Sequence, residues 1–206
     1  MSCHLGVEFT AVPVAAEEVN GLIYNRAVVG WGMSSVSASF DTTEIDGDLK
    51  AMGFGVEGVV AENVFLRFTY DKGDGDIDVS ANGQSGNLDA ESIEMGFTFG
   101  YRIGLAPGTD LVPLIEYIDS STKVDGESED DTFTVYGLRL NTRLSESVQA
   151  TFGFKTDGKG DEYGKTYEIG ALFKVQQNFG LGARYVLNEN DISDSKTWVL
   201  TAEYLF

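Results

Sequence analysis

Large apolar side chains occupy every second position in a series of short segments along this chain. In the clearest segment, residues 93–103, they alternate with glycine, threonine and charged side chains. Successive side chains of a β-strand point to opposite faces, so this alternation predicts strands with one apolar and one polar face. Ten such segments are predicted, and no helical periodicity interrupts them. The predicted strands are residues 27–40, 49–60, 64–71, 93–103, 114–118, 136–144, 148–155, 167–175, 179–187 and 196–206.

The connections between these segments alternate in length. Residues 61–63, 106–110, 145–147 and 176–178 are short turns, whereas the connections between them are mostly longer and more acidic, as in residues 72–90 and 120–131. This arrangement predicts an up-and-down antiparallel sheet with short turns at one rim and long acidic loops at the other. We expect a bulge at residues 33–35, where the alternation breaks, and a strand start at Pro113, which cannot donate to the ladder.

The last segment carries the most specific signal. Trp198, Leu200, Tyr204 and Phe206 share one face of the predicted closing strand, which ends on the aromatic terminal residue. This pattern resembles the C-terminal insertion signal of bacterial outer-membrane β-barrels, and nearly all of residues 27–206 is similar in architecture to small barrels of the OmpA/opacity type. The resemblance implies a ten-stranded transmembrane barrel in the bacterial outer membrane, or an eight-stranded one if residues 27–40 form an irregular arm. Outer-membrane lipid, lipopolysaccharide and the barrel-assembly machinery are the implied partners.

Alternation alone does not decide which face of the barrel is inside. A soluble lipocalin-like barrel would bury the apolar face around an apolar ligand, whereas a membrane barrel turns that face to lipid. Three features favour the membrane barrel over the soluble one. The polar face combines glycine with charged side chains, aromatic side chains lie near both ends of the strands, and the strands have about 9–11 residues. The polar face then becomes a lumen in which charges pair. The predicted network is Arg67, Glu94, Arg102, Glu116, Arg139, Arg143, Glu168, Arg184 and Glu203.

The net charge of −19 argues against a nucleic-acid partner, which requires a basic surface. Asp74, Asp76 and Asp78 resemble the start of a calcium loop, but the glycine at the sixth position is missing and Ser85 stands at the acidic twelfth. These three aspartates are therefore only weak candidates for divalent cations in an acidic loop. No cofactor motif is present in the sequence.

Chemistry on the barrel is not expected. The only histidine is His4, in an N-terminal fringe of residues 1–26 that precedes the predicted barrel, residues 27–206. Within the fringe, residues 12–16 are similar to the end of a secretory signal, and a poorly ordered extension is the alternative. Without a histidine on the strands, a Ser-His-acid triad cannot form there. The sequence predicts a non-enzymatic barrel for envelope structure or surface interaction, with a narrow channel for small solutes as the alternative.

Overall fold

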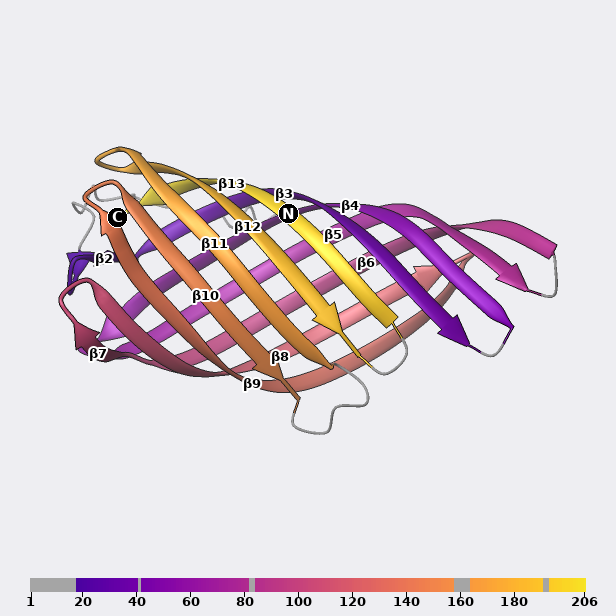
Figure 1. The fold of residues 1–206 in the computed structure, drawn as a ribbon, viewed down its shortest axis with the longest axis horizontal. Helices are drawn as coiled ribbons and strands as arrows, with labels where there is room; N and C mark the ends of the chain where they lie inside the picture. Colours follow the sequence, from indigo (N-terminus) through magenta and orange to yellow (C-terminus); the bar gives the residue numbers. More distant parts are fainter. Residues whose placement is uncertain (1–17, 41, 82–83, 158–163, 191–192) are drawn as a thin grey trace, which may run out of the picture.

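The computed structural model describes residues 18–40, 42–81, 84–157, 164–190 and 193–206. Strands account for nearly all of them (Figure 1). Two short strands come first, β1 (Glu18–Val19) and β2 (Leu22–Ile23). The strands of the barrel sheet are β3 (Arg26–Phe40), β4 (Thr43–Ala61), β5 (Val64–Ala81), β6 (Gln84–Tyr101), β7 (Ile103–Ala106), β8 (Thr109–Val124), β9 (Glu127–Ser145), β10 (Val148–Thr156), β11 (Lys165–Gln176), β12 (Phe179–Glu189) and β13 (Ser193–Leu205).

The long strands close into one antiparallel barrel. Apart from β6 and β7, strands that follow one another in the chain pair with each other, and β13 pairs with β3 to join the two ends of the sheet. β6 and β7 are two parts of one strand, interrupted at Arg102, and both pair with β8. The barrel therefore has ten strands, and the predicted all-β, up-and-down fold is confirmed. The eight-stranded alternative is wrong, because β3 is a regular member of the sheet.

The four short turns lie together at one end of the barrel. They fall at residues 62–63, 107–108, 146–147 and 177–178, as the sequence predicted. The C-terminus and β2 lie at this same end, whereas the hairpins of β3–β4 and β5–β6 extend far beyond the opposite end (Figure 1). Short turns mark the periplasmic rim of outer-membrane barrels, so the extended hairpins belong to the external side.

The predicted long acidic loops are largely strand. β5 continues to Ala81 and β6 starts at Gln84, while β8 and β9 are joined by a tight turn at Asp125 and Gly126, both with positive φ. These segments are rich in aspartate and glycine, which are uncommon in strands, so composition suggested loops. The period of two nevertheless persists through them, with acidic side chains facing outward and Ile77 facing inward.

Two local expectations in the strands are also corrected. β3 keeps its register with both neighbours and has no bulge at residues 33–35. The alternation breaks there because the outward positions change from apolar to polar where the strand leaves the lipid. Pro113 lies inside β8 rather than at its start. Its missing N–H is tolerated because the ladder to the adjacent strand is interrupted at Tyr101 and Arg102, and Arg102 donates its own N–H to Asn63.

The outer face of the barrel is apolar and the inner face is polar. Exposed apolar side chains cover the outside, including Trp31, Phe54, Phe97, Ile169 and Leu200. Aromatic side chains lie near both ends of this surface, as in the girdles of transmembrane barrels. Among the described residues there is no helix long and apolar enough to span a membrane.

Candidate functional site

The lumen combines glycine with charged side chains on the inner face of the strands. At Gly170 a Cβ atom would come within 2.9 Å of the Arg184 side chain, and at Gly182 it would collide with Thr201 and Glu203. Glycine is therefore required at these two positions because a neighbouring long polar side chain occupies the space. Every arginine of the chain lies on the inner face: Arg26, Arg67, Arg102, Arg139, Arg143 and Arg184.

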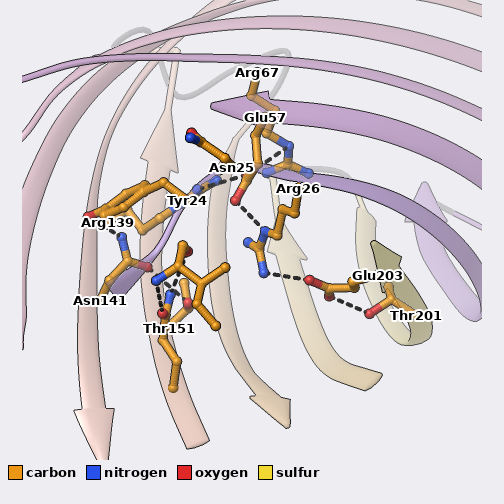
Figure 2. A network of polar contacts seen from close by, with 12 residues as sticks. Tyr24, Asn25, Arg26, Glu57, Arg67, Arg139, Asn141, Thr151, Thr201 and Glu203 are labelled. Carbon is orange, nitrogen blue, oxygen red and sulfur yellow. Dashed lines mark hydrogen bonds and ion pairs between the residues drawn. The ribbon is translucent and has the colours of Figure 1, made fainter. Parts of the chain in front are cut away.

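Glu57 is the centre of the main ion-pair network (Figure 2). Its carboxylate accepts a hydrogen bond from Nε of Arg26, and Nη1 of Arg139 and Nε of Arg67 approach it to 3.5 Å and 4.0 Å. Arg26 also donates to Glu203 at 2.8 Å. Since an unpaired buried charge is costly, this arrangement stabilises every charge it contains through an opposite partner.

A second group of charges continues the network toward the external side. Nζ of Lys155 donates to Glu116 at 2.7 Å, and the Thr98 hydroxyl donates to the same carboxylate at 2.9 Å. Arg184 lies 3.8 Å from Glu168. Glu94 is on the inner face as predicted, directly opposite Asp71 in the β5–β6 register.

The periplasmic mouth of the lumen is occupied by residues 18–25. β1 and β2 form a small hairpin whose turn, Asn20 and Gly21, has positive φ at both positions. Beyond it, Leu22 and Tyr24 pack in a buried cluster with Phe65 and Val112 of the barrel wall. Ile23 packs in a second buried cluster with Leu172 and Leu205. We refer to residues 18–25 as the mouth segment.

The mouth segment corrects the expected boundary between fringe and barrel. Residues 18–26 were assigned to the fringe, but the structure buries Leu22, Ile23 and Tyr24 against the barrel wall and places Arg26 at the start of β3. The sequence signal was weak because Leu22, Ile23 and Tyr24 are consecutive apolar residues without alternation. The assignments of residues 1–17, including His4, lie outside the described residues.

Polar contacts fix the mouth segment in place. Tyr24 donates its hydroxyl proton to Asp110 at 3.1 Å and accepts from Nδ2 of Asn141 at 3.1 Å. Asp110 also accepts from Arg102 at 2.6 Å and from Asn20 at 2.6 Å. The Arg102 guanidinium lies 4.6 Å from the centre of the Tyr24 ring, within cation–π range.

Burial raises the pKa of Tyr24 to about 12, so its phenol keeps the proton that it donates to Asp110. The folded protein holds this proton more tightly than an unfolded chain, whose tyrosines titrate near pH 10. The Tyr24 contribution to stability is therefore complete below pH 10 and is lost as the pH rises toward 12.

The structure separates the predicted network into two places. Arg67, Glu94, Glu116, Arg139, Glu168, Arg184 and Glu203 lie along the lumen, whereas Arg102 and Arg143 lie at the mouth, Arg143 against Gly21. Sequence reasoning missed Arg26, Glu57, Asp110 and Lys155. For Glu57 and Lys155 the signal was available, because each occupies a polar-face position in its predicted strand.

The C-terminal residues follow the predicted division of faces. Trp198, Leu200 and Tyr204 point outward and are 65%, 60% and 45% exposed. Phe206 donates its backbone N–H to the carbonyl of Asn25, the last residue of the mouth segment, and its ring stacks on Tyr204. Recognition of this strand by the assembly machinery stays a prediction.

The weak metal candidates lie on the outer face of β5. Asp74, Asp76 and Asp78 project outward from the strand rather than from a loop. Within the described ranges, no group of three or more His, Cys, Asp or Glu side chains is arranged to hold a metal ion.

A closed barrel that is apolar outside and charge-paired inside is a transmembrane β-barrel of the bacterial outer membrane. The sequence model of the autotransporter beta-domain family matches residues 19–203, and the chain belongs to this family. The soluble lipocalin-like alternative is therefore wrong. No match was found among curated proteins.

Similar solved structures support the same fold. The translocator domain of the autotransporter NalP from Neisseria meningitidis is 14% identical with a TM-score of 0.53, covering 89% of this chain and 88% of that one. The outer membrane protease OmpT from Escherichia coli is 9% identical with a TM-score of 0.58, covering 89% and 97%. The beta domain of the Bordetella autotransporter BrkA is 15% identical with a TM-score of 0.53, covering 88% and 100%. At these identities the likeness concerns the fold alone.

Proposed function

We propose that this protein is a non-enzymatic outer-membrane barrel with a closed lumen, which contributes to envelope structure and presents its extended acidic strands for surface interaction. The observation that carries this proposal is the filling of the lumen. Acidic and basic side chains pair across it, and the mouth segment packs into its periplasmic end. A ten-stranded barrel is little wider than the side chains that fill it, so paired charges leave no continuous path for solutes.

The absence of catalysis is part of the same proposal. Nucleophilic sites of the Ser-His-acid type need a histidine within hydrogen-bond reach of the nucleophile. The only histidine of the chain is His4, which precedes the first described strand. Glu57 and Glu203 pair with Arg26, and Glu116 pairs with Lys155, which supports a structural role for these three carboxylates.

Conductance of the refolded barrel in planar lipid bilayers tests the closed lumen. We expect no stable conductance steps from the natural chain. The variant Asp110→Asn removes the charge that faces Arg102 and weakens the bonds to Asn20 and Tyr24, so it should release the mouth segment and produce steps. Asp119→Asn is the matched control, since Asp119 lies on the outer face of the same strand. Reproducible steps from the natural chain would replace this proposal with the narrow-channel alternative.

A second candidate function is translocation of the chain's own N-terminal region to the cell surface. The family match and the position of the mouth segment, which enters the lumen from the periplasmic end, favour this candidate. An epitope inserted between Glu17 and Glu18, after the segment that resembles a secretory signal, distinguishes the two functions. Cleavage of the epitope by protease added to intact cells indicates translocation, whereas cleavage only after the outer membrane is opened supports the closed barrel.

A further inference from the structure

The inner face of the barrel changes character where the strands extend beyond the lumen on the external side. Thr98 and Glu116, directly opposite each other on β6 and β8, are buried, whereas Glu94, four residues further along β6, is exposed. β10, β11 and β12 have 9 to 12 residues, while β4, β5, β6, β8 and β9 have 16 to 19 and form a wall that continues past them (Figure 1). We refer to the inward-facing residues of this wall that lie external to Thr98 and Glu116 as the extension face.

The outer part of the extension face is an apolar patch. Ile77 lies directly opposite Leu88 in the β5–β6 register, and Ile45 lies opposite Val79 in the β4–β5 register. The next row toward the membrane consists of Leu49, Gly75, Ala90 and Val124. The large side chains of this patch are half-buried and belong to neither of the two buried clusters of the barrel. Apolar surface held outside the membrane favours a partner that removes it from water.

A row of acidic side chains borders the apolar patch on the membrane side. Asp71 lies directly opposite Glu94, and Ser120 stands between Glu94 and Asp131 in the same row. The row that separates them from the patch has only small or hydroxyl side chains, including Gly73, Ser92 and Thr122. Carboxylates and apolar surface therefore lie on one face without a bulky side chain between them.

β9 carries the acidic border along a second side of the patch. Glu129 and Glu127 follow Asp131 at every second position, and Glu127 is directly opposite Val124. These two carboxylates and the three of the acidic row are all exposed. None of the five forms an ion pair or a hydrogen bond with a side chain in the part of the chain that the structure describes.

The basic side chains near these acids are engaged elsewhere. Lys155 exerts the largest attraction on Glu94, but it donates to Glu116 at 2.7 Å. Arg184 also attracts the acidic row, but it lies 3.8 Å from Glu168. The extension face therefore carries negative charge that the chain does not neutralise, in contrast to the paired charges of the lumen.

The two parts of the extension face call for one ligand with two kinds of surface. An apolar ligand would leave the carboxylates unpaired, and a small cation would leave the apolar patch in water. From Glu94 to Leu88 the face spans six strand residues, about 20 Å, which matches the length of a helix of about 13 residues.

We propose that the extension face binds a cationic amphipathic peptide segment. The apolar side chains of the peptide contact Ile77 and Leu88, and its basic side chains pair with Glu129 and the acidic row. This inference names the class of partner for the surface interaction in the proposed function, and it rests on that function.

Fluorescence anisotropy tests the proposal with the full chain refolded into phosphatidylcholine nanodiscs. The probe is a fluorescein-labelled helical peptide of about 14 residues made of leucine and lysine. It should bind in a saturable manner once the signal from empty nanodiscs is subtracted. The same peptide with glutamate in place of lysine should not bind, because it would meet unpaired carboxylates. Equal binding of the two peptides would overturn the proposal.

Removal of the β9 charges tests the acidic border. Glu127→Gln, Glu129→Gln and Asp131→Asn combined should weaken binding of the lysine peptide about tenfold, because each exposed ion pair contributes roughly a two- to threefold change in affinity.

The matched control removes three exposed charges from the outer face of the same wall. It combines Glu91→Gln, Asp119→Asn and Asp130→Asn on β6, β8 and β9, so both triple variants have the same net charge. The control should bind within about twofold of the parent, since it touches no contact of the peptide. Equal weakening by the two triple variants would show that net charge alone attracts the peptide, and the proposal would be wrong.

Ile77→Thr combined with Leu88→Thr tests the apolar patch and keeps a β-branched side chain at both positions. This variant should also weaken binding about tenfold, because two apolar contacts are lost. Full binding by this variant would contradict the proposal. All variants should show the heat-dependent gel mobility of a folded barrel. No binding by a natural barrel that conducts no ions would overturn this inference and leave the closed lumen intact.

Discussion

At the residue scale, the ion pairs in the lumen rely on a few carboxylates, each of which contacts several basic side chains. Glu57 is the clearest case, because Arg26, Arg67 and Arg139 all direct their guanidinium groups at it. The Glu57 side chain is only 5% exposed, so water can provide few hydrogen bonds in place of an ion pair that is lost. A single change at this position therefore leaves several charges without a partner.

Glu57→Gln should lower the free energy of unfolding by about 3 kcal/mol, the order found when one partner of a buried ion pair is removed. The measurement is urea unfolding of the refolded protein in detergent, followed by tryptophan fluorescence. Glu91→Gln is the control, since Glu91 lies on the outer face of β6 and is exposed. An equal, small effect of the two substitutions would contradict the assigned role of Glu57.

At the element scale, the long strands pass from lipid into water without losing register. β4 and β5 pair continuously over most of their length, with one irregularity near their short turn. In the external part the strands must approach closely, and Gly75 faces the backbone of Asp48 and Leu49 with no room for a side chain. This close packing, rather than a loop, supports the acidic hairpins.

Gly75→Val should separate the external parts of β4 and β5 while leaving the membrane part folded, because the added side chain collides with backbone atoms. Limited proteolysis with an enzyme specific for acidic residues should then cut near residues 44–48 and 74–78, and the gel mobility should still depend on heating. Gly86→Val on β6 is the control, since a Cβ there meets nothing within 4 Å. Equal resistance of the two variants to proteolysis would refute the packing role of Gly75.

The sequence predicted correctly the strands in which apolar and polar side chains alternate regularly. It failed where the residue composition and the period of two pointed to different structures. The ten strands and four short turns followed from period two alone. The external extensions were missed because aspartate and glycine mark turns by composition, while the outward direction of Asp74, Asp76 and Asp78 depends on pairing. The mouth segment was missed because its contacts, such as that of Ile23 with Gln149, span 126 residues and leave no local pattern.

At the scale of the whole molecule, charge is balanced inside and strongly negative outside. The external face of the sheet places Asp48, Asp76 and Asp89 directly opposite one another on three adjacent strands. Like charges in this position are destabilising. The repulsion among acidic side chains that accompanies the net charge of −19 therefore destabilises mainly the extended hairpins.

Salt should stabilise the protein as a consequence. Raising sodium chloride from low concentration to about 0.5 M shortens the range of electrostatic repulsion, so the thermal unfolding midpoint measured by circular dichroism should rise. Asp76→Asn removes the central charge of the row and should reduce this dependence. A midpoint that falls with salt, or a dependence that the variant retains in full, would show that the external repulsion is unimportant.

The mouth segment also has a consequence for the order of folding. Its partners, Asp110, Asn141, Gln149, Leu172 and Leu205, all come later in the chain, and the last belongs to the strand that closes the barrel. The segment therefore reaches its native contacts only after those strands have been synthesised and brought together. Because contacts between distant residues form slowly, docking of the mouth segment into the barrel should be the final step of assembly, although residues 18–25 precede every strand of the barrel in the chain.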